Sequence, residues 1–211
     1  MREDGTAERL MQSLNHRIKN NLQLVHSLLQ LQAGSTKSSE TRDSLERAAA
    51  RVLVFARVHE RLYKTRDVEG VDLQAYLGDL CRDIEESLAG PEEGPSISLS
   101  IAPLRLPIES VLPLGLVVNE LLDNAARHAY GQGPGVIELT LECPEGAAEC
   151  QLAVADQGPG LPEGTLPATG GMGTMIVKAL TRQLGGTLAF GPGANEKGAR
   201  IVVGLPRKIF E

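Results

Sequence analysis

The sequence predicts an α+β protein in which a helical hairpin precedes a two-layer α/β sandwich. Long apolar repeats of helical spacing fill residues 6–64 and are broken once, at Gly34-Ser35. Residues 69–211 mix helix and strand patterns without the regular alternation of a doubly wound parallel sheet. We therefore expect two domains, residues 1–68 and residues 69–211.

The composition narrows the class of protein. Of the 211 residues, 42% are hydrophobic, which is enough apolar material for a folded core. The net charge of -6 and the absence of Trp argue against a nucleic-acid partner. No apolar run approaches membrane-spanning length and no signal peptide is evident, so we expect a cytoplasmic protein without a membrane segment.

The three cysteines, Cys81, Cys143 and Cys150, show no CxxC spacing and so signal neither a zinc site nor a disulfide framework. Cys143 and Cys150 flank a predicted hairpin, a position from which they can pair. For a cytoplasmic protein, however, reduced thiols are the expected state.

The first predicted helix, residues 6–32, has an apolar face wider than the seam of a two-stranded coiled coil. Its heptad a and d positions hold Met11, Leu14, Ile18, Asn21, Val25 and Leu28. Ser38 or Ser39 then caps a second helix, residues 40–64. A hairpin this apolar cannot bury itself, so we expect a homodimer that forms a four-helix bundle. The alternative is that the rest of the chain covers the apolar face of the hairpin.

In the second domain, Asp72 is predicted to cap a helix over residues 73–88. Further helices are expected over residues 108–130 and 174–184. Alternating patterns predict strands over residues 96–102, 136–142, 151–155, 187–190 and 199–205. The glycine-rich stretch from residue 156 to residue 173 is predicted to be a loop.

Four polar residues share one face of the helix predicted over residues 108–130: Glu120, Asn124, Arg127 and His128. The opposite face is apolar and reads as core, with Leu114, Val118, Leu121, Leu122 and Ala125. An amide oxygen suits a hard cation and basic groups suit anionic oxygens, so this stripe indicates a site for phosphate and a divalent metal. A solvated polar face is the alternative.

Two glycine groups lie in the predicted loop. Asp156-Gln157-Gly158-Pro159-Gly160 leaves a strand, and Gly170-Gly171-Met172-Gly173 enters a helix. Glycines allow the backbone to approach a ligand closely, helix N-termini favour phosphate, and an Asp can accept a hydrogen bond from an amine such as that of adenine. The alternative is that the two glycine groups are ordinary turns that bind no ligand. The acid here precedes the glycines, whereas a dinucleotide-binding GxGxxG motif places its acid after them, so that motif is not favoured. A Walker-type phosphate loop is excluded because no GxxxxGK occurs.

His16 stands in the stretch LNHRIKNNLQ, on the exposed face of the first helix, as does His26. A surface histidine usually has no special role, and His26 keeps that interpretation. Arg17 and Lys19 lie beside His16, and such cations favour a phosphoryl group added to the imidazole and keep the ring neutral.

Together, these pieces resemble the core of a two-component sensor histidine kinase. LNHRIKNNLQ resembles the phosphoacceptor box of the subfamily with an HRxKNN signature, and NELLDNAARHAY resembles the family's N box. DQGPG and GGMG resemble the two glycine boxes of the Bergerat-type ATP-binding fold, and LGGTL near the end also fits. The four motifs occur in the family's order and span nearly the whole chain.

The resemblance implies a role for each matching residue. His16 accepts the γ-phosphoryl group of ATP, and Asn124 binds the Mg²⁺ that bridges the phosphates. Glu120 orients metal-bound water or acts as a base, and Arg127 and His128 contact phosphate.

On the adenine side, the resemblance implies that Asp156 receives the exocyclic amine. The glycines implied to shape the nucleotide loop are Gly158, Gly160, Gly171 and Gly173. Two positions depart from the family pattern. Arg17 stands where many relatives carry an acid, so the usual carboxylate base beside the histidine is absent. Ala199 replaces a Thr or Ser, so we expect weaker support for the adenine site.

The implied function is an ATP-dependent autokinase that phosphorylates His16 and passes the group to an aspartate of a response regulator receiver domain. The signal would come from a sensor domain or sensory partner outside this chain. A histidine phosphotransferase or phosphatase module without autokinase activity is the alternative, and an ATPase without a phosphohistidine is a third interpretation.

Overall fold

The computed structural model describes residues 4–64, 70–88, 94–131, 133–160, 171–193 and 197–210; for residues 4–16 and 57–64 it describes the backbone alone. The chain separates into two compact units, Met1–Val68 and Glu69–Glu211. Among the helices of the described ranges, none is both long and apolar enough to cross a membrane.

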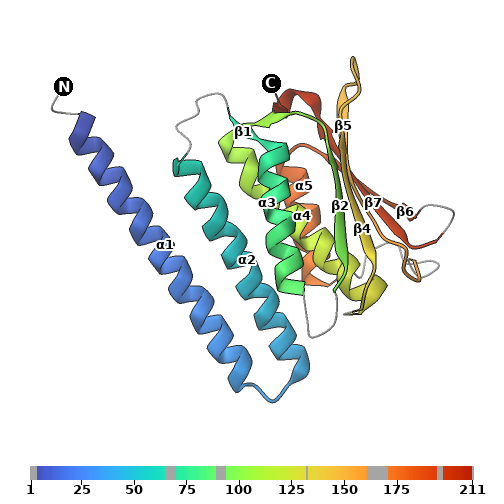
Figure 1. Cartoon of the computed structure of the whole chain (residues 1–211), viewed down its shortest axis with the longest axis horizontal. Coiled ribbons are helices and arrows are strands. Elements are labelled where there is room, and N and C mark those ends of the chain that lie inside the picture. The colour runs from blue at the N-terminus through green and yellow to red at the C-terminus, as the bar shows by residue number, and fades with distance from the viewer. Residues whose placement is uncertain are drawn as a thin grey trace. The chain divides into compact units, whose positions relative to one another are not determined.

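The first unit is a hairpin of two helices, α1 (Asp4–Ser35) and α2 (Ser39–Lys64), which run side by side (Figure 1). The Ser38 hydroxyl accepts a hydrogen bond from the Thr41 amide at 3.2 Å, so Ser38 is the residue that caps α2. Arg42 closes the turn by donating to the carbonyl groups of Ala33 at 3.3 Å and Thr36 at 3.1 Å.

The apolar face of α1 is only partly covered within the hairpin. Ala33 is buried, and Leu22, Leu29 and His26 are half-buried, so His26 is less exposed than the sequence predicts. A strip of larger side chains stays exposed: Leu24 (60%), Val25 (43%), Leu28 (51%) and Leu31 (71%).

The second unit is a five-stranded mixed sheet with three helices on one face (Figure 1). Its strands are β2 (Ser96–Ile101), β4 (Val136–Glu142), β5 (Glu149–Ala155), β6 (Thr187–Pro192) and β7 (Ala199–Pro206), in the spatial order β2-β4-β5-β7-β6. β2 and β4 are parallel, and the other pairs are antiparallel. The helices are α3 (Leu73–Leu88), α4 (Ile108–Ala125) and α5 (Met172–Gln183). This arrangement confirms the predicted fold class.

Aliphatic side chains fill the layer between sheet and helices, as the low aromatic content requires. The largest fully buried residues are Leu73, Leu77, Leu106, Leu114, Leu121, Leu122, Ile137, Leu139, Leu141, Leu152 and Leu205. Asp72 caps α3 as predicted, because its carboxylate accepts a hydrogen bond from the Ala75 amide at 3.0 Å. The sequence did not predict two short paired strands, β1 (Val71–Asp72) and β3 (Arg105–Leu106), or a final 3-10 turn, Arg207–Phe210.

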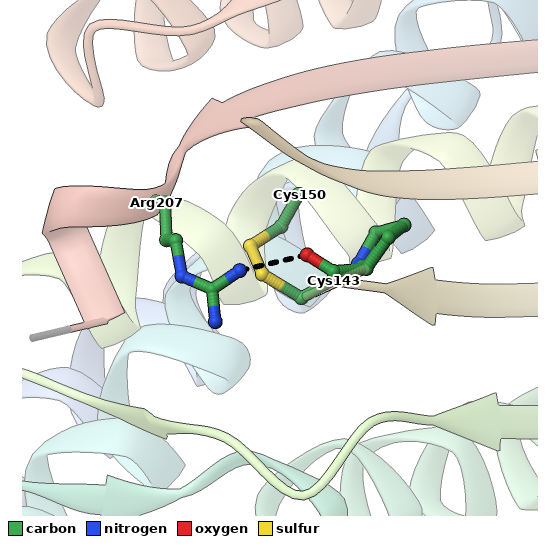
Figure 2. The surroundings of a disulfide bond; sticks show 4 residues. Cys143, Cys150 and Arg207 are labelled. Carbon is green, nitrogen blue, oxygen red and sulfur yellow. Dashed lines mark hydrogen bonds between the residues drawn. A yellow bond between two sulfur atoms is a disulfide. The ribbon is translucent and has the colours of Figure 1, made fainter. Parts of the chain in front are cut away.

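The expectation of reduced thiols is wrong for two of the three cysteines, because Cys143 and Cys150 form a disulfide bond (Figure 2). Glu142 pairs with Gln151 in the β4–β5 ladder, so the next residues outward, Cys143 and Cys150, face each other, with Cα atoms 4.2 Å apart. Arg207 lies beside this bond and donates to the Pro144 carbonyl at 2.8 Å. The disulfide thus lies at the end of the β4–β5 hairpin, beside the C-terminal turn that contains Arg207.

Cys81 is the one free cysteine among the described residues, and it is buried in α3. Burial, and secondarily the nearby Glu85 carboxylate, raises the pKa of the Cys81 thiol to about 12. The thiol therefore stays protonated at neutral and mildly alkaline pH and is a poor nucleophile.

Thiol titration tests both assignments. At about pH 8 the native chain should show no rapidly reacting thiol, because only thiolates react and Cys81 remains protonated. Unfolding without reductant should expose one thiol per chain, and unfolding with reductant should expose all three. A Cys81→Ala variant is the control and should show none until it is reduced. Three reactive thiols in the unreduced, unfolded chain would contradict the disulfide.

Candidate functional site

The polar stripe of α4 grades from buried to exposed. The five predicted core positions on this helix are all buried, but Glu120 is also buried, at 4% exposure. Asn124 is half-buried, and Arg127 and His128 are exposed. A solvated polar face therefore does not describe this helix, because its first polar member lies in the interior.

The predicted helix over residues 108–130 changes form before its end. α4 stops at Ala125, and Ala126–Tyr130 is a π-helical turn, followed by Gly131 with a positive φ of 65°. Such wider turns are frequent at functional sites. They also change the angular spacing of side chains, so Arg127 and His128 do not continue the regular 3.6-residue stripe from which they were predicted.

Arg127 is held by Asp123, a residue that the sequence reasoning missed. Two nitrogens of the guanidinium lie 2.9 and 3.0 Å from the two carboxylate oxygens of Asp123, which makes the pair bidentate. Both side chains are partly exposed, at 40% for Arg127 and 25% for Asp123. The i, i+4 spacing of an acid and a base was the available signal.

Asp156 follows β5 and is fixed by main-chain donors. Its Oδ1 accepts hydrogen bonds from the amides of Gly158 at 2.9 Å and Ala199 at 3.1 Å. The Asp156 amide in turn donates to the Ala199 carbonyl at 2.9 Å. Both of these bonds use Oδ1, and no described residue donates to Oδ2. Because the support comes from the Ala199 backbone, the absence of a Thr or Ser hydroxyl there does not leave Asp156 unsupported.

Glycines allow the backbone to pack closely on both sides of Asp156. A Cβ at Gly198, where φ is +71°, would overlap the Asp156 carbonyl oxygen. On the other side, a Cβ at Gly158 would overlap the Ala129 backbone in the π turn. The fold thereby brings the predicted residues Asp156 and Gly158 next to the turn that carries Arg127 and His128.

The remaining glycines occupy the edges of this region. Gly160 has a positive φ of 82°, and Gly171 immediately precedes α5, where an added Cβ would meet no described atom within 4 Å. Gly173 lies in the first turn of α5, and its N-cap residue, Gly171, makes no side-chain capping hydrogen bond with the described part of the chain. The loop between residues 161 and 170 lies outside the described residues.

His16 is located in α1, in the other unit, and its side chain lies outside the described residues. A dedicated metal cage is not seen either: the described part of the chain contains no group of three or more His, Cys, Asp or Glu placed to hold a metal ion. Mg²⁺ that binds through one or two protein ligands and substrate phosphates needs no such group, so Asn124 alone is compatible with this mode.

Comparison with known families places these features in context. Residues 13–88 match the family model described as "Histidine kinase". Residues 109–209 match the model described as "Histidine kinase-, DNA gyrase B-, and HSP90-like ATPase". The chain therefore belongs to the histidine kinase family and carries the ATPase domain of that family.

Individual relatives agree with this assignment. The chain is 31% identical over 198 residues to the sensor histidine kinase PdtaS of Mycobacterium tuberculosis, a match that covers 93% of this chain and 39% of PdtaS. It is 27% identical to the blue-light-activated histidine kinase 2 of Erythrobacter litoralis, over 86% of this chain and 53% of the relative. The chain thus spans roughly two fifths to one half of these relatives' length.

A solved structure shows the same fold. The histidine kinase domain of a blue-light-activated histidine kinase from Erythrobacter litoralis superposes with a TM-score of 0.67 at 24% identity. The match covers 99% of this chain and 95% of that domain.

Gly198 offers a direct test of the geometry around Asp156. Gly198→Ala should lower the free energy of unfolding of the second unit by at least about 2 kcal/mol, because an alanine is strained at positive φ and its Cβ would displace Asp156. Gly191→Ala in β6 is the matched control, since its Cβ would meet no atom of the described residues within 4 Å. Urea unfolding of both variants gives the measurement. Equal stability of the two variants would contradict the described packing.

Proposed function

We propose that the chain is the core of a sensor histidine kinase that binds Mg-ATP, phosphorylates its own His16 and passes the phosphoryl group to an aspartate of a response regulator receiver domain. The observation that carries the proposal is the joint occurrence of both family matches in one polypeptide, with HRIKNN at residues 16–21 and the Asp156 loop at the end of β5. A sensor domain or sensory partner would supply the signal.

Nucleotide binding is assigned to the second unit. The Asp156 Oδ2 accepts a hydrogen bond from the adenine amine, while Gly158, which packs on Ala129, holds the Asp156 turn against the π turn. Arg127, His128 and the N-terminus of α5 are the groups that would contact the triphosphate. Asn124 is the metal ligand of this proposal.

The transfer forms a bond between an imidazole nitrogen of His16 and the γ-phosphorus. It breaks the bond between that phosphorus and the oxygen bridging to the β-phosphate, so ADP leaves with the electron pair, and the imidazole proton passes to a base. Arg17 cannot be that base at neutral pH. The deep burial of Glu120, at 4% exposure, favours a role in orienting metal-bound water over one as this base.

Incubation with γ-labelled ATP tests the autokinase. The wild-type chain should acquire acid-labile label, and His16→Ala should reduce it by at least about a hundredfold because the nucleophile is lost. His26→Ala is the matched control, since it removes a second histidine from the same helix and should leave the label unchanged. Adding a cognate receiver domain should move the label onto that domain.

Three results would contradict the proposal, and the last two would favour a competing function. Undiminished label in His16→Ala would exclude His16 as the acceptor, and steady phosphate release without label on the chain would indicate an ATPase. A wild-type chain that binds Mg-ATP no more tightly than Asp156→Asn, in calorimetry, would favour a phosphotransfer module that does not use the nucleotide site.

The exposed strip of α1 supports homodimerisation as part of the proposal. Leu24, Val25, Leu28 and Leu31 present a continuous apolar surface that one hairpin does not bury. Two copies that pair through this strip would form a four-helix bundle and remove the strip from water.

Light scattering tests the dimer. At micromolar concentration the wild-type chain should have twice the mass of one chain, and the double variant Leu24→Glu, Leu28→Glu should be monomeric, because buried like charges oppose association. Gln30→Glu, an added charge at an exposed polar position on α1, is the control and should stay dimeric. A monomeric wild type would refute the proposal.

A further inference from the structure

Tyr130, the last residue of the π turn, connects three parts of the second unit through its hydroxyl. The hydroxyl donates to the Val136 carbonyl at the start of β4, at 2.7 Å. It accepts from the Gln157 amide, directly after Asp156, at 3.0 Å. An amide can only donate and a carbonyl can only accept, so the single hydroxyl proton has one possible direction, and both bonds depend on the same oxygen.

The surrounding backbone is shaped to receive this side chain. A Cβ at Gly135 would overlap the Tyr130 ring, so the residue before β4 must be glycine for the ring to lie where it does. The Gly133 amide donates to the Tyr130 carbonyl at 2.9 Å, which holds Gly133 beside the end of the π turn. The ring position is therefore set by packing, and the hydroxyl adds the link to the Asp156 loop.

The link acts on the one segment that carries the adenine-facing carboxylate. Asp156, Gln157 and Gly158 form a tight turn in which the Gly158 amide donates to Asp156 Oδ1, leaving the Gln157 amide to point to Tyr130. Gly158 also packs on Ala129, the neighbour of Tyr130. Two adjacent contacts thus join the loop to the π turn that bears Arg127 and His128.

We infer that Tyr130 is a positioning residue, whose hydroxyl sets the placement of Asp156 and thereby the preference for purines that carry a 6-amino group. The inference rests on the proposed function, in which Asp156 receives the adenine amine. Tyr130 touches the loop backbone and acts on the base only through Asp156, so its effect should depend on whether the base offers that amine.

The test compares two nucleotides on three proteins. Dissociation constants are measured by calorimetry for Mg-ATP and for the Mg complex of purine riboside triphosphate, which lacks the 6-amino group. Tyr130→Phe keeps the packed ring and removes only the hydroxyl. It should weaken ATP binding about three- to tenfold and change binding of the analogue by less than about twofold, as expected for one mispositioned hydrogen bond.

Tyr76→Phe is the matched control. It deletes the hydroxyl of a buried tyrosine in α3, a residue outside the Asp156 loop and the π turn, and should leave the ratio of the two dissociation constants unchanged. Thermal melts of each variant measure the change in global stability. A purely structural role of the hydroxyl would change the melting temperature without changing the ratio of the two dissociation constants.

The outcomes distinguish a failure of the Tyr130 positioning role from a failure of the proposed nucleotide binding. An equal loss of affinity for both nucleotides in Tyr130→Phe, or no loss for either, would overturn the positioning role while the proposed function stands. A wild-type chain that binds neither nucleotide would overturn both. A selective loss for ATP, absent in Tyr76→Phe, supports the inference.

Discussion

The arrangement of the second unit depends on the way Asp156 is fixed at the end of β5. The main-chain amides of Gly158 and Ala199 both donate to Asp156 Oδ1, and the side chains of these two residues have no polar group that could do so. Main-chain donors lose no side-chain rotamer entropy when they are ordered, so the carboxylate is held without mobile supports. The close packing at Gly198 and Gly158 then follows, because any larger residue would push the loop away from β7 on one side or from the π turn on the other.

Helix α4 is the second fixed part of the site, since it is buried along nearly its whole length. A charged residue in such a helix is retained only with compensation, and Glu120, at 4% exposure, lies one turn before the half-buried Asn124. The change to a π turn after Ala125 takes the chain from this rigid interior to the exposed Arg127 and His128. This stretch of the chain thereby combines a buried acid and a half-buried amide with two exposed basic residues.

Local patterns predicted the elements well, because hydrophobic period and capping are properties of neighbouring residues. Strand β4 and helix α3 have the predicted bounds, and the core positions of α4 are buried. The Asp123–Arg127 pair was missed although its i, i+4 spacing is local, whereas the support of the Asp156 loop depends on contacts between distant residues. The amide of Ala199 reaches Asp156 across 43 positions, and the hydroxyl of Tyr130 reaches Gln157 across 27, so neither is visible in local spacing. The Cys143–Cys150 bond was misjudged because an expected compartment was weighed above the strand register that places the two residues opposite each other.

The pairing of Arg127 with Asp123 has a consequence for the kind of anion that the site can accept. A triphosphate that approaches Arg127 must share the guanidinium with a carboxylate of its own sign. The pair is partly exposed and screened, so separating it costs little. The repulsion between Asp123 and a bare triphosphate would still oppose binding, and a divalent cation carried with the phosphates offsets it. Since Asn124, the proposed metal ligand, directly follows Asp123, the local charges favour a nucleotide that arrives with its cation over the free anion.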